Sequence, residues 1–123
     1  LYNSGKTTLT NAIISNYAWS VNCAGNTIVD GGNNLQYPKL TCGMMTSKDP
    51  LLVAPVNNGG NVPTMALKPG SPAIDGGNNT VCGGIMVNNR DARGFTRPVD
   101  GDNNGSAQCD IGAYEYGAKN TKG

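Results

Sequence analysis

The chain has 123 residues, a formal net charge of +1 at pH 7 and only 14% charged residues. One domain fits this length, and the nine scattered basic residues exclude the clustered basic face of a nucleic-acid-binding protein. We also expect no membrane insertion, because no apolar run is long enough to cross a bilayer.

Two segments near the start of the chain have the composition of β-strands. Residues 7–16 are rich in Thr and Ile and end at an asparagine, and residues 26–35 follow the same order of an apolar pair and then an Asn or Gly turn. β-Branched residues favour strands. Leu9, Ile13 and Asn16 also have helical spacing, but Thr and Asn are weak helix formers. The two segments therefore predict successive rungs of a β-solenoid, with isoleucines stacked inside and asparagines at the corners.

The rest of the chain is dominated by turns. The 18 glycines and 7 prolines favour short irregular segments, and the strongest break is Asn-Asn-Gly-Gly at 57–60. The two prolines of residues 69–77 indicate a segment that wraps the domain instead of entering a sheet. We therefore expect one module over residues 1–116, with 1–40 rung-like and 41–116 a loop-rich cap, followed by a flexible tail over 117–123.

The chain has four cysteines, an even number for a short sequence, and no histidine. No two of them form a C-x-x-C pair, which argues against a zinc site and favours two disulfides in an oxidising compartment. Four cysteines permit three connectivities. Because each half of the sequence holds two cysteines, the favoured pairs are Cys23–Cys42 and Cys82–Cys109. Each disulfide would stabilise the fold by about 3 kcal/mol.

The segment that begins at Asp100 has the composition of a calcium-binding loop. Oxygen-bearing side chains alternate along it and a glycine follows, as a hard cation requires. The EF-hand pattern is not met, because Ile111 stands where that loop needs glutamate. We therefore expect a calcium loop of another kind, with Asp100, Asp102, Asn104 and Asp110 as ligands. The alternative is an Asn/Asp/Gly turn whose side chains cap their own backbone.

Two arginines lie among several carboxylates in the second half of the chain. The planar guanidinium groups of Arg93 and Arg97 suit paired hydrogen bonds to carboxylates. We expect structural ion pairs with Asp75, Asp91 and Glu115 that hold irregular loops together where apolar packing is scarce. The alternative is a binding site for an anionic ligand.

The sequence gives little support to catalysis. The absence of histidine excludes the usual Ser–His and Cys–His nucleophiles. A carboxylate pair such as Asp91 and Asp110 is the arrangement of a glycoside hydrolase. However, the acids lie in Gly/Asn-rich turns or beside Arg, surroundings expected to keep them ionised. Residues 4–7, Ser-Gly-Lys-Thr, end like a phosphate-binding loop, but no helical pattern follows them. We therefore expect no enzyme.

Short motifs follow one another in order along most of the chain. They are Asn-Thr-Ile (26–28), Gly-Asn-Asn-Leu (32–35), Cys-Gly (42–43), Asp-Pro-Leu-Leu (49–52), Asn-Gly-Gly (58–60), Pro-Thr-Met-Ala-Leu (63–67), Pro-Gly-Ser-Pro-Ala-Ile-Asp (69–75), Asp-Ala-Arg-Gly (91–94), Arg-Pro (97–98) and Cys-Asp-Ile-Gly-Ala-Tyr-Glu-Tyr (109–116). Together they resemble the C-terminal choice-of-anchor region of bacterial surface proteins with right-handed parallel β-helix (pectate-lyase-like) bodies. The resemblance implies export, attachment or assembly at the cell surface, and a structural end-piece without catalytic residues. It also implies the cysteine pairing favoured above.

We therefore expect an all-β fold, the terminal rungs of a right-handed parallel β-helix with an irregular, disulfide-stapled C-terminal cap. The expected function is that of a non-catalytic structural module, extracellular and at a cell surface, derived from a longer exported precursor. A solenoid has open strand edges at its ends. The cap would protect one edge, and the N-terminal rung would dock on another copy, which predicts end-to-end assembly into a fibre.

Two alternative functions remain open at this stage. The first is a carbohydrate-binding adhesin module, in which Tyr2, Tyr17, Trp19 and Tyr37 form a platform for surface glycans instead of covering the thin core. The second is a polysaccharide-cleaving β-helix enzyme that depends on calcium.

Overall fold

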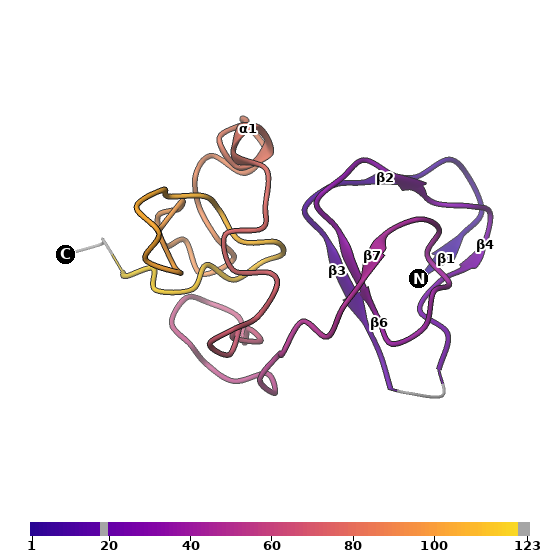
Figure 1. The fold of residues 1–123 in the computed structure, drawn as a ribbon, viewed down its shortest axis with the longest axis horizontal. Coiled ribbons are helices and arrows are strands. Elements are labelled where there is room, and N and C mark those ends of the chain that lie inside the picture. Colours follow the sequence, from indigo (N-terminus) through magenta and orange to yellow (C-terminus); the bar gives the residue numbers. More distant parts are fainter. Residues whose placement is uncertain (18–19, 121–123) are drawn as a thin grey trace.

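The computed structural model describes residues 1–17 and 20–120. Within these ranges, seven short strands lie in the first 47 residues, and turns with one short helix follow (Figure 1). The fold is therefore all-β, built from short parallel strands. The elements are β1 (Tyr2–Asn3), β2 (Thr8–Leu9), β3 (Ile13–Ser15), β4 (Ala24–Gly25), β5 (Val29–Asp30), β6 (Leu35–Tyr37), β7 (Thr46–Ser47) and α1 (Asn79–Cys82).

The strands stack in two layers. The first layer consists of β1, β2 and β3, and each strand pairs in parallel with its counterpart β4, β5 or β6 in the second. Partners are separated by 21 or 22 residues, so the chain passes along the same three sides twice (Figure 1). β7 then pairs in parallel with β6 and begins a third layer.

The sequence predicted only part of this pattern. The expected strand segments 7–16 and 26–35 contain β2, β3, β5 and the first residue of β6. β1, β4 and β7 were not predicted, and β7 extends the stacked strands past the boundary expected at residue 40. In register, Ile13 lies opposite Leu35 instead of a second isoleucine.

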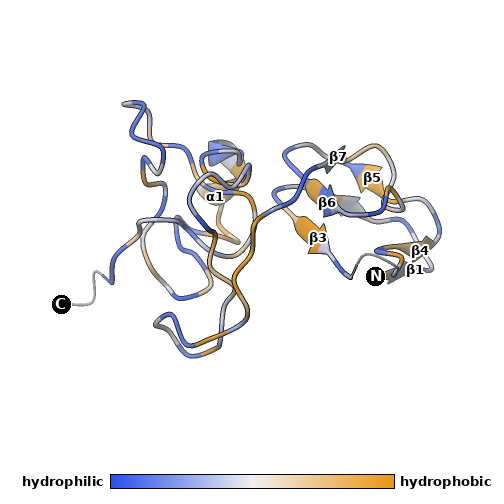
Figure 2. Ribbon diagram, turned by 60° about the horizontal axis from the view of Figure 1, so that its bottom comes forward, coloured by the Kyte–Doolittle hydropathy of each residue, from blue (hydrophilic) through white to orange (hydrophobic). Residues whose placement is uncertain are grey.

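Neighbouring side chains of β3 face two different hydrophobic clusters. Ile14 packs inside the stacked strands against Ile28, Met45 and the Cys23–Cys42 pair. Ile13 points the other way and packs against a cluster that Leu35 of β6 shares with Leu67, Ala73 and Ile111 of the loops. Figure 2 shows this apolar character on β3 and β5.

The loop-rich part therefore covers the outer face of β3 and β6, not the last strand edge as the sequence had suggested. At that edge the turn before β7 covers the second layer. Thr41 Oγ1 accepts hydrogen bonds from the backbone N–H groups of Asn22 (2.9 Å) and Cys23 (3.1 Å). The Cys23–Cys42 disulfide holds the same turn in place.

Two asparagines at equivalent corners join the strands to the loops. Asn11 and Asn33 both have left-handed backbone conformations, with φ of 56° and 57°, which asparagine tolerates better than most residues. The Asn11 side chain accepts from Asn78 N (2.8 Å) and donates to Asn78 O (3.2 Å). Asn33 Nδ2 donates to Gly76 O (2.9 Å). The corner asparagines predicted from the sequence thus serve as attachment points for the loops.

The expected tail falls partly outside the described residues. Near its start, Ala118 N donates a hydrogen bond to Glu115 O (3.3 Å). Residues 121–123 lie beyond the described range.

Candidate functional site

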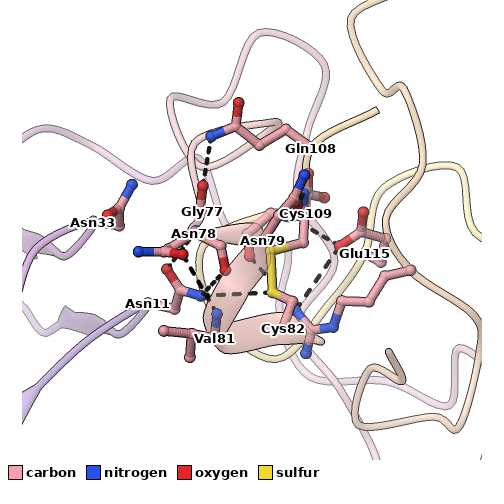
Figure 3. The surroundings of a disulfide bond; sticks show 12 residues. Asn11, Asn33, Gly77, Asn78, Asn79, Val81, Cys82, Gln108, Cys109 and Glu115 are labelled. Atoms are coloured by element: carbon pink, nitrogen blue, oxygen red, sulfur yellow. Dashed lines mark hydrogen bonds and ion pairs between the residues drawn. A yellow bond between two sulfur atoms is a disulfide. The ribbon is translucent and has the colours of Figure 1, made fainter. Parts of the chain in front are cut away.

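The second disulfide lies where the strands meet the loops (Figure 3). Cys82 and Cys109 are bonded with a Cα–Cα distance of 6.6 Å, and Cys23 and Cys42 with one of 5.1 Å. These are the two pairs expected from the sequence. Asn11 Nδ2 reaches Cys82 Sγ at 3.5 Å, so the disulfide, α1 and a corner of the strands share one contact region.

A buried carboxylate at Asp91 organises the loops around it. Its Oδ1 accepts from the backbone N–H groups of Arg93 (2.8 Å) and Phe95 (3.1 Å), and its Oδ2 accepts from that of Glu115 (3.1 Å). These donors belong to segments without regular secondary structure, so no strand ladder could satisfy them. The carboxylate replaces the missing ladder.

Arg93 completes this arrangement. Its Nη2 lies 2.7 Å from Asp91 Oδ2, and its Nε donates to the same oxygen at 2.9 Å. The guanidinium carbon lies 4.2 Å from the ring centroid of Phe95 and 3.8 Å from that of Tyr114. Two aromatic contacts and a buried ion pair leave this arginine well packed. The geometry is that of a structural ion pair, as predicted, instead of an anion-binding site.

Arg97 mainly binds backbone carbonyls. Its Nε donates to Arg90 O (3.0 Å) and its Nη1 to Gly112 O (3.0 Å). The ion pair with Glu115 is longer, at 3.9 Å between Nη1 and Oε2. Arg97 therefore links three loop segments and places one positive charge beside a buried carboxyl group.

Asp110 and Glu115 are the most deeply buried acids of the described chain, both with 0% exposure. Glu115 accepts from Val99 N and Asp110 N, each at 2.9 Å, and Asp110 accepts from Asp75 N at 2.8 Å and from Tyr116 N. Burial nevertheless raises the pKa of Glu115 to about 7 and that of Asp110 to about 6. The expectation that the surroundings keep all acids in their ionised form is therefore wrong for these two.

The proposed calcium ligands are only partly brought together. Asp100 and Asp102 lie close to one another, and the third acid of the cluster is Asp75, with one carboxylate oxygen from each within 4.8 Å of the others. Asn104 is adjacent and donates from Nδ2 to Asp102 Oδ2 (3.0 Å). Asp110 does not belong to this cluster, because its carboxylate binds backbone N–H groups in the interior. Sequence reasoning missed Asp75, which lies 25 residues before Asp100.

Asp75 also does not make the ion pair that the sequence predicted. Its carboxylate instead accepts from the backbone N–H groups of Gly101 (3.1 Å) and Asp102 (2.9 Å). Asp100 similarly accepts from Asn104 N and Gly105 N. Three hard oxygen donors suit calcium chemically, and the same hydrogen bonds also suit a turn capped by its own side chains.

A mostly apolar groove of about 1030 Å³ lies between β3 and the loops. Three tyrosines from separate segments line it, Tyr17, Tyr37 and Tyr114. Tyr17 and Tyr37 were expected in an aromatic platform. Tyr2, on β1, does not line the groove, and Trp19 lies outside the described residues. Tyr114 was missed because only the fold brings residues 109–116 against β3.

Comparison with family models gives no match to this chain, and neither a curated protein nor a solved structure matches it significantly. The resemblance of the motifs to the choice-of-anchor region therefore stays a hypothesis. Within the ranges described by the structure, no helix has the length and apolar character of a membrane span.

The buried carboxyl groups predict an unusual pH dependence of stability. For Glu115, the folded pKa of about 7 lies above the ordinary value of 4.5, so the folded state binds the extra proton between these values. This contribution is fully present below about pH 4.5 and is lost as the pH rises through about 7. We expect the free energy of unfolding, measured with urea, to fall by on the order of 2 kcal/mol between about pH 5 and pH 8.

Glu115→Gln tests this assignment. The variant should be less stable, because its amide meets a backbone N–H where the carboxylate accepted one. The loss of stability between about pH 5 and pH 8 should become smaller, since only Asp110 still contributes. Asp49→Asn, at an exposed acid, is the matched control. An unchanged pH dependence in Glu115→Gln would contradict the assignment.

Calcium binding at the cluster of Asp75, Asp100 and Asp102 predicts a higher melting temperature in millimolar calcium than in chelator. A ligand that binds only the folded state stabilises it, and several degrees are expected for a domain of this size. Asp102→Asn should abolish the difference, whereas Asp30→Asn, an exposed acid on β5, should retain it. Equal melting temperatures with and without calcium would assign the segment to a self-capped turn.

Proposed function

We propose that this chain is a non-catalytic extracellular structural module, the terminal part of a right-handed parallel β-helix at a cell surface. The observation that supports this proposal best is the stacking of three parallel strand pairs at a nearly constant separation of 21 or 22 residues. Such a period is the mark of a solenoid, in which each coil buries its apolar face on the next. The short strands are then successive sides of its last coils.

The loop-rich part suits a structural role on such a coil. Its apolar cluster covers Ile13 and Leu35 of the outer sheet face, and the corner asparagines fasten it. Its buried acids are occupied by backbone N–H groups and do not line the groove. A catalytic acid must reach its substrate, so these carboxyl groups favour a structural role.

The disulfides support a location outside the reducing cytosol. Two disulfides indicate an oxidising environment. A thin core of small clusters needs such covalent support, because little apolar surface is buried in each. We therefore place the module outside the cell, where the motif resemblance also places it.

Adding one coil to the chain tests the β-helix. A second copy of residues 1–22 placed before Leu1 has the length of one coil. If the chain is part of a β-helix, the added copy folds on the open edge of β1, β2 and β3, and its strand amides gain protection from hydrogen exchange. A copy of residues 1–17 alone is out of register and should stay unprotected. Equal exchange in both constructs would contradict the β-helix. Cleavage of acidic polysaccharides by the unmodified chain would contradict the non-catalytic role.

Glycan binding is the second candidate function, and the groove favours it. Tyr17 is 84% exposed and, with Tyr37 and Tyr114, presents aromatic surface to that groove. Sugar rings pack on such aromatic faces while their hydroxyl groups bind nearby polar groups. On a glycan array we expect Tyr17→Ala to lose binding and Tyr2→Ala, which removes a tyrosine 73% exposed outside the groove, to retain it. Absence of any bound glycan, or equal binding by both variants, would contradict this function.

A further inference from the structure

The first layer of strands has one unpaired edge. Within the described ranges, β1, β2 and β3 each pair with one strand only, in the second layer. Parallel pairing uses alternate residues. The carbonyl groups of Thr7 and Leu9 accept from Val29 N and Gly31 N. The N–H and C=O groups of Thr8, between them, therefore face away from the second layer.

This edge lacks the features by which proteins usually prevent strand pairing. Edge strands are commonly protected by lysine, proline or a bulge. The three strands read Tyr-Asn, Thr-Leu and Ile-Ile-Ser, with no charge and no proline. Lys6 is the only charged residue among the first 29. Charge repulsion therefore opposes the approach of a second polypeptide only weakly.

The opposite end of the stack is different. In the described structure its free strand is β7, with two residues, and Lys48 follows directly. Thr41 already accepts from the backbone N–H groups of Asn22 and Cys23 there. A head-to-tail contact would place three open strand edges against one short strand. The two ends do not match, which disfavours an open-ended fibre.

We propose that two copies of this chain associate through the open edges of β1, β2 and β3 about a two-fold axis perpendicular to the stacking direction. The rotation makes facing strands run antiparallel, a pairing at least as stable as the parallel one. The contact is the same patch on both copies, so it closes after two. This inference rests on the proposed structural function and names its partner, a second copy of the chain.

Matched lysine substitutions at the two ends of the stack test the proposal. Thr8, on β2, and Ser47, on β7, are both exposed strand residues. Sedimentation velocity over a hundredfold range of concentration should show a monomer–dimer equilibrium for the unmodified chain. Thr8→Lys should raise the dimer dissociation constant by roughly tenfold or more, since its two copies face one another across the pairing. Ser47→Lys should leave the dissociation constant unchanged.

Hydrogen exchange gives a second measurement that needs no variant. The amide of Thr8 should become protected as the concentration rises, while that of Gly105, in an exposed turn, should not change. A monomer at every concentration, growth beyond two copies, or equal effects of the two lysine variants would overturn the proposal. The added-coil experiment separates this outcome from failure of the proposed function. A monomeric chain on which the extra coil folds refutes only the dimer.

Discussion

Buried carboxylates that accept hydrogen bonds from loop backbone are the interaction on which the rest of this structure depends. An unpaired N–H group in the interior costs about 1–3 kcal/mol, and the loops of residues 51–120 have almost no strand ladder to supply partners. Asp91 satisfies three such groups, and Asp110 and Glu115 satisfy two each. Their burial is therefore compensated by the donors that they bind.

The two parts of the molecule solve the same problem by different means. In residues 1–47 backbone groups pair with backbone groups of the next layer, and one disulfide secures the turn over the second layer. In the loops, side chains take this role, with Arg93 held between two rings to balance the charge of Asp91. The parts meet at Asn11 and Ile13, where one residue supplies hydrogen bonds and the other an apolar contact.

Sequence reasoning succeeded where the chemistry of a residue is local. Thr- and Ile-rich segments predicted β2 and β3, and the distribution of cysteines favoured the observed disulfides. It failed for β1, β4 and β7, because strands of two residues form through pairing and leave little trace in composition. The exchange of Asp110 for Asp75 in the acidic cluster has a similar cause. Neighbours in sequence were taken as neighbours in space, whereas Asp110 lies in the interior. The raised pKa of Glu115 followed from burial, which no sequence pattern displayed.

Amide hydrogen exchange of the loops tests the central role of the carboxylates most directly. The amides of Phe95 and Glu115 lie outside regular secondary structure, and both donate to Asp91. If buried carboxylates hold the loops as a strand ladder would, these amides should exchange as slowly as that of Leu35, which donates to Ala12 between layers. Exchange of both as fast as in an unfolded chain, with Leu35 still protected, would contradict this account.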